Sequence, residues 1–201
     1  MSKKIEYRAF KTELRAMADK PCVEGYAAVY NVSTDLGYGY RESINPAAFV
    51  RALQEKQDVR GLFNHDANLI LGRTKSGTLR LSSDNTGLHF ECDINEADPE
   101  AMSVRAKIMR GDVDQCSFAF SAVEDNVKYN DDGTCDRELM DVDLFDVSPV
   151  TYPAYDTTSC EARSVEAVRA SIIEARAKAI EKNLTSDQLE TLRLRIAMRN
   201  R

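Results

Sequence analysis

Residues 115–150 read QCSFAFSAVEDNVKYNDDGTCDRELMDVDLFDVSPV. This stretch contains the two longest strand candidates in the chain, residues 115–129 and 135–150. They are joined by Asn-Asp-Asp-Gly at residues 130–133, which is typical of a tight turn because these residue types tolerate the backbone conformations that reverse a chain. The stretch therefore predicts one long β-hairpin.

Shorter strand candidates and two helix candidates precede this hairpin. Strands are expected at residues 5–14, 22–30, 59–64, 69–73, 78–81 and 88–94. One helix is expected to open at Asn45-Pro46, and a second should run from Asp98-Pro99 to Arg110. Strands in excess, mostly joined by short turns, predict an α+β protein. We expect mainly an antiparallel β-barrel or sheet, with helices packed outside.

The pattern changes near the C-terminus. From about residue 164, apolar residues recur at helical spacing in two segments separated by residues 182–185. Residues 161–201 carry nine Lys/Arg against six Asp/Glu, a net charge of +3, so residues 1–160 carry −9 of the total −6. We therefore expect a β-rich domain of residues 1–160 and a basic amphipathic helical tail of residues 161–201. The tail either docks on other helices, self-associates or covers the body.

Composition excludes several classes of protein. The acidic body argues against nucleic acid as its main partner. No stretch without charged residues approaches the length of a membrane-spanning helix. No apolar run follows Lys3 and Lys4, so we expect no secretory signal. The five cysteines show no C-x₂-C spacing, which argues against a structural zinc site. Their odd number and wide spread, in a chain where no signal peptide is expected, favour reduced thiols.

The chain has only two histidines, which restricts any chemistry that needs an imidazole. His65 lies at the end of a predicted strand, between Asn64 and Asp66, where it should be available as a general base. His89 lies inside another predicted strand and should face solvent. The alternative for each is a surface histidine with no function.

Period-2 alternation divides the strand that begins at residue 115 into two faces. The side chains of Cys116, Phe118 and Phe120 form an apolar face that suits a core, which should leave the Cys116 thiol buried and inert. The opposite face carries only small side chains, including Ser117, so it can be approached. Ser117 is therefore the candidate nucleophile and His65 its candidate base. The alternative is a strand of small residues that packs against a neighbouring element.

A third group should hold the far nitrogen of the imidazole. Asp146 interrupts the apolar run of residues 144–147, where a carboxylate is costly without a partner. Asp141 and Asp143 lie nearer the polar turn, where solvent should satisfy them. Asp146 is the candidate orienting residue, and the alternative is an exposed strand edge.

Several short motifs follow one another along the chain: GYAAVYN at 25–31, ESINPAAF at 42–49, NHD at 64–66, LGR at 71–73, GL at 87–88, CSFAF at 116–120 and DVSPVTYPAY at 146–155. In this order they resemble the prohead protease family of tailed bacteriophages. The resemblance covers residues 23–158. It implies a serine endopeptidase of the herpesvirus-assemblin-like fold, with the family histidine at His65, the family serine at Ser117 and an acidic residue at Asp146, where many relatives have Glu. The family pattern Ser-Phe-Gly-Phe reads Ser-Phe-Ala-Phe here.

The resemblance also implies partners and a location. Substrates would be the scaffolding part of the major capsid protein and the chain itself, within the assembling procapsid in the host-cell cytoplasm. No cofactor, metal, nucleic acid or membrane is implied, and a homo-oligomer is left open. Arg73 could help to stabilise an oxyanion. The alternatives are a non-catalytic procapsid scaffold or structural subunit with the same fold, and a cysteine hydrolase that uses Cys116.

Overall fold

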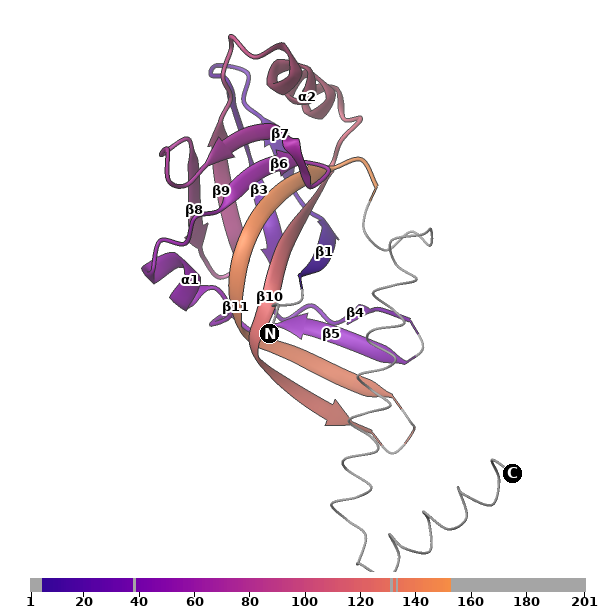
Figure 1. Ribbon diagram of the computed structural model, residues 1–201. Helices are drawn as coiled ribbons and strands as arrows, with labels where there is room; N and C mark the ends of the chain where they lie inside the picture. The colour runs from indigo at the N-terminus through magenta and orange to yellow at the C-terminus, as the bar shows by residue number, and fades with distance from the viewer. Residues whose placement is uncertain (1–4, 38, 131, 133, 153–201) are drawn as a thin grey trace, which may run out of the picture. The chain divides into compact units, whose positions relative to one another are not determined.

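The computed structural model describes residues 5–152 except residues 38, 131 and 133 (Figure 1). The chain divides into two units, Met1–Asp156 and Thr157–Arg201, and all described residues belong to the first. The expected helical tail, residues 161–201, lies outside the described residues. Neither helix of the described part is long and apolar enough to cross a membrane.

The described part contains eleven strands and two helices. The strands are β1 (Glu6–Lys11), β2 (Leu14–Ala16), β3 (Cys22–Val29), β4 (Thr34–Asp35), β5 (Tyr40–Ile44), β6 (Arg60–Phe63), β7 (Asp66–Arg73), β8 (Leu79–Ser83), β9 (Gly87–Asp93), β10 (Gln115–Tyr129) and β11 (Cys135–Val150). The helices are α1 (Val50–Gln54) and α2 (Pro99–Arg110). The predominance of strands with a few helices agrees with the expected α+β class.

The strands form two sheets. The larger has the order β1-β10-β11-β5-β4, with β6 also paired to β11 and β7 to β6, and the smaller has the order β2-β3-β9-β8. Figure 1 shows β10 and β11 as a long curved pair that runs through the larger sheet. These two strands are antiparallel and keep the bounds expected from the sequence.

Of the expected barrel or sheet, the described residues form a sheet and no closed barrel, and the sheet is not wholly antiparallel. The first part of β11 pairs with β5 and its last part with β6, both in parallel orientation. One edge of β11 is thus shared by two strands that continue into separate branches of the sheet. Strands β1, β4 and β7 each pair on one side only, so the sheet ends in open edges.

The single strand expected at residues 5–14 is divided between the sheets. β1 pairs with β10 of the larger sheet, whereas β2 pairs with β3 of the smaller one. The chain crosses over at Thr12, whose hydroxyl donates to the Tyr26 carbonyl at 2.7 Å. Gly25 permits this crossing, because a Cβ there would lie 2.6 Å from the Glu13 carbonyl oxygen.

The predicted ends are correct for one helix and wrong for the other. α1 begins at Val50 rather than Pro46. The Asn45 side chain accepts from the Ala47 N–H at 2.9 Å, but residues 46–49 form a turn before the helix starts. α2 has the expected ends. The Asp98 carboxylate caps its first turn, and Gly111 ends it with a φ of 84°.

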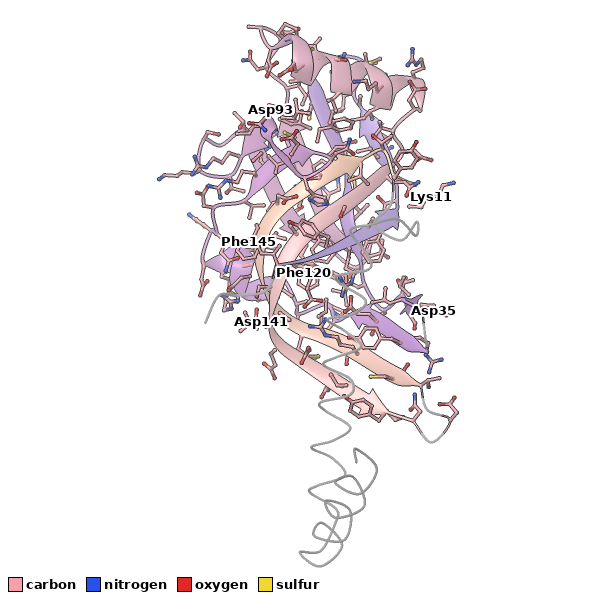
Figure 2. The ribbon with its side chains drawn as sticks, turned by 45° about the vertical axis from the view of Figure 1, so that its right-hand side comes forward. Lys11, Asp35, Asp93, Phe120, Asp141 and Phe145 are labelled. Atoms are coloured by element: carbon pink, nitrogen blue, oxygen red, sulfur yellow. The ribbon has the colours of Figure 1, made fainter. Side chains whose placement is uncertain are left out.

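The core contains the apolar face of β10. Cys116, Phe118 and Phe120 have no exposed surface, and the rings of Phe118 and Phe120 stack with centroids 4.9 Å apart. Figure 2 labels Phe120 and Lys11, which lie at opposite ends of the β1–β10 pairing. The expected alternation along β10 is therefore correct, and it directs Ser117 to the other face.

Candidate active site

His65 lies in the two-residue turn between β6 and β7. Phe63 pairs with Asp66, which leaves Asn64 and His65 as the loop. Both residues have positive φ, 55° for Asn64 and 56° for His65, as a type I′ hairpin turn requires. Non-glycine residues adopt this conformation rarely, although Asn and His do so more readily than most. The turn follows β6, which pairs with β11 at Arg60 and Gly61, and from it the His65 imidazole reaches Asp146 of β11.

The three residues predicted from the sequence lie in contact. His65 Nε2 is 2.7 Å from Ser117 Oγ, and His65 Nδ1 is 2.6 Å from Asp146 Oδ1. Both bonds are satisfied when Nδ1 carries the proton and donates to Asp146. Nε2 then accepts from the Ser117 hydroxyl. This is the arrangement of nucleophile, base and orienting carboxylate that acyl-transfer chemistry uses.

The sheet places Ser117 and Asp146 on one face. Ser117 of β10 pairs with Ser148 of β11, and Ala119 pairs with Asp146, so the four side chains point the same way. Asp146 is 7% exposed, whereas Ser117 and Ser148 have no exposed surface. The expected open face of small residues is therefore covered at Ser117, in part by the His65 ring.

Ser148 is a site residue that sequence reasoning missed. Its hydroxyl donates to Asp146 Oδ1 at 2.7 Å, so that one oxygen accepts from both Ser148 and His65. The signal was available in the sequence. Ser148 lies two residues after Asp146 in a strand, and residues i and i+2 share a face.

Tyr7 is a second neighbour that was missed. Its ring meets the His65 ring edge to face, with centroids 4.7 Å apart. Tyr7 lies on β1, the outer neighbour of β10, and its side chain is still partly exposed. No local signal connects these two residues, because the contact depends on the pairing of β1 with β10.

The remaining candidates lie elsewhere. Cys116 points into the core, and burial raises the pKa of its thiol, which makes it a poor nucleophile. His89 is half-buried on β9 of the smaller sheet and packs edge to face on Tyr26 at 5.1 Å. His89 was expected to face solvent, but it is only partly exposed. It makes no contact with Ser117 or His65 in the candidate site.

Three charged residues have partners that the sequence did not reveal. The Arg73 guanidinium forms two hydrogen bonds with the Asp58 carboxylate, at 2.7 and 2.5 Å. Asp141 and Asp143 both accept from Arg51, at 2.7 and 2.8 Å, rather than being satisfied by solvent alone. Over residues 5–152, apart from the three undescribed positions, no three His, Cys, Asp or Glu side chains are grouped to hold a metal ion.

Comparison with known proteins identifies the family. Residues 7–171 match the model of the family described as Caudovirus prohead serine protease. The match shows that the chain is a protease, and the family description indicates that it is of the serine type. The chain belongs to the caudovirus prohead serine protease family, as the ordered motifs implied.

One relative is similar over most of the chain. The prohead protease of Enterobacteria phage HK97 is 27% identical over 163 residues, which cover 79% of this chain and 68% of that protein. No solved structure matches the chain.

Proposed function

We propose that this protein is a serine endopeptidase in which Ser117 is the nucleophile, His65 the general base and Asp146 the residue that orients His65. The observation that carries the proposal is the pair of short contacts from the two nitrogens of His65 to Ser117 and Asp146. Ser117 and Asp146 are buried and His65 is partly buried, so each side chain has lost solvent that its hydrogen-bond partners replace.

The mechanism follows from the contacts. His65 Nε2 takes the Ser117 proton as Ser117 Oγ attacks a peptide carbonyl, and the Asp146 carboxylate stabilises the imidazolium that forms. His65 then protonates the leaving amine and activates a water molecule that releases the acyl group. Donors for the oxyanion each contribute about 10²-fold or more in rate. Since Arg73 is engaged by Asp58, backbone N–H groups are the expected donors.

The substrate class follows from the family. We propose that the enzyme cleaves the scaffolding part of a phage major capsid protein, and itself, within the assembling procapsid in the host cytoplasm. The family description and the name of the phage relative support a capsid-maturation role. In this proposal residues 1–160 are the protease domain and residues 161–201 a basic tail that associates with capsid or scaffold helices.

The test compares two variants, one that replaces the proposed nucleophile and one that replaces a matched serine. Ser117→Ala should abolish cleavage of the co-expressed capsid precursor. Cleavage is measured by the gel mobility and the intact mass of the precursor. Ser121→Ala is the control, because Ser121 is also buried on the same face of β10, four residues along the strand. The control should cleave normally.

Retained cleavage by purified Ser117→Ala would contradict the serine assignment. Absence of any cleavage by the native chain, with normal procapsid assembly, would instead support the non-catalytic scaffold.

A further inference from the structure

The turn that carries His65 is attached to β11 by its neighbour, Asn64. The Asn64 N–H donates to the Pro149 carbonyl at 3.0 Å. The Asn64 side chain makes two more bonds: Oδ1 accepts from the Thr151 N–H at 2.8 Å, and Nδ2 donates to Thr151 Oγ1 at 3.2 Å. Three hydrogen bonds thus join one loop residue to the end of a strand 85 or more positions later in the chain.

The hydrogen bonds of Asn64 attach to the part of β11 that carries the candidate catalytic groups. Pro149 and Thr151 lie one and three positions after Ser148, which pairs with Ser117, and Asp146 lies two positions before Ser148 on β11. Asn64 therefore ties the backbone that holds His65 to the strand that holds its partner Asp146. The neighbouring backbone pairing of β6 with β11 is short, since only Arg60 and Gly61 have partners on β11. The Asn64 bonds extend this contact up to the turn itself.

The identity of residue 64 suits both tasks. A type I′ turn favours Asn at its first central position, because Asn tolerates positive φ at less cost than most residues. Glycine would tolerate it as well but has no side chain to reach Thr151. If residue 64 only had to allow the turn, glycine would be sufficient. The two side-chain bonds to Thr151 therefore indicate a second role for Asn64.

We propose that Asn64 is a positioning residue, which sets the distance and angle of the His65 imidazole relative to Ser117 and Asp146 by fixing the β6–β7 turn to the end of β11. This inference rests on the proposed function. Misplacement of a catalytic group by about 1 Å can cost on the order of 10²-fold in rate. Loss of the attachment therefore lowers the reactivity of Ser117 more than it lowers the affinity for a ligand.

The experiment compares Asn64→Gly with Asn31→Gly. Asn31 is also a non-glycine residue with positive φ, 56°, but lies in an exposed turn after β3. Both substitutions keep the turn conformation accessible and remove one amide side chain. The probe is a fluorophosphonate, which phosphonylates an activated serine with loss of fluoride, and saturation kinetics separate its maximal labelling rate from its half-saturating concentration.

We expect Asn64→Gly to lower the maximal labelling rate of Ser117 about 10- to 100-fold, with the half-saturating concentration changed less than about threefold. Asn31→Gly should stay within about twofold of the native protein in both. Asn64→Asp keeps the acceptor for the Thr151 N–H and should recover part of the rate. If Asn64→Gly does not fold, as judged by circular dichroism, Thr151→Val replaces it with a smaller expected loss of about threefold.

Two results would overturn the inference. One is labelling of Asn64→Gly at the native rate, and the other is an equal loss in Asn31→Gly, which would mean a general effect of the substitution. Ser117→Ala is labelled in parallel, because labelling that survives this change disproves the proposed nucleophile rather than the role of Asn64.

Discussion

Replacement of Ser148 by Ala tests the bond between Ser148 and Asp146. The Ser148 hydroxyl is fully buried and donates to a carboxylate at 2.7 Å. A hydrogen bond to a charged group contributes about 1.5–3 kcal/mol. Ser148→Ala removes one of the two side-chain donors to Asp146 Oδ1 and leaves the other, His65, in place. We expect the free energy of unfolding to fall by about 1.5–3 kcal/mol, within the range for such a bond.

The assay is urea unfolding followed by far-ultraviolet circular dichroism, since the chain has no tryptophan. A double-mutant cycle with Asp146→Ala isolates the bond from other effects of either change. In the Asp146→Ala background the Ser148 hydroxyl has lost its acceptor, so Ser148→Ala should then cost nothing or stabilise the fold. An equal cost of Ser148→Ala in both backgrounds would refute the reasoning, because the bond would then contribute nothing to stability.

Three further predictions concern the core and the buried charges. Burial raises the pKa of the Cys116 thiol, so iodoacetamide at pH 8 should not inactivate the folded enzyme; inactivation that parallels modification of Cys116 would revive the cysteine-hydrolase alternative. Glu42 is buried and accepts from both Arg8 and Arg137, so Glu42→Ala should lower the free energy of unfolding in urea by about 3–5 kcal/mol, and a change under about 1 kcal/mol would contradict this. Burial opposes ionisation of Glu6, but hydrogen bonds and charges of Arg137 and Arg8 outweigh it and lower the pKa of Glu6 from 4.5. Because the folded pKa is the lower one, the stability that Glu6 contributes is complete above pH 4.5 and is lost as pH falls through the folded pKa; the difference in melting temperature between native protein and Glu6→Gln should therefore shrink in acid, and a constant difference between pH 7 and pH 3 would disprove the linkage.

Local signals in the sequence were sufficient for the long hairpin. The alternation around Phe118 and the Asn-Asp-Asp-Gly turn define β10 and β11, and their bounds agree with the expectation. The same signals do not say which strand occupies the other edge of β11. That edge is shared between β5 and β6, whose first residues are 20 positions apart, and the choice between a barrel and an open sheet depends on it.

The candidate site divides in the same way. His65 could be singled out because it lies at a strand end, Ser117 because it lies on a strand face of small side chains, and Asp146 because it interrupts an apolar run. Their neighbours could not. Tyr7 meets His65 only through the pairing of β1 with β10, and Asn64 meets Thr151 across 87 positions of chain. Contacts of this kind depend on strand pairing, which one sequence does not encode as a local pattern.

The separation of the site residues along the chain has a consequence for folding. His65 lies 52 positions from Ser117 and 81 from Asp146, and β11 is the last strand that the structure describes. Such non-local contacts form late, because the entropy of closing the intervening loops must be offset before they stabilise anything. A nascent or partly folded chain therefore contains Ser117 as an ordinary alcohol. In the proposed mechanism Ser117 would become reactive only when β11 has paired with β10 and the β6–β7 turn has placed His65 against both strands, so cleavage would require a completed fold.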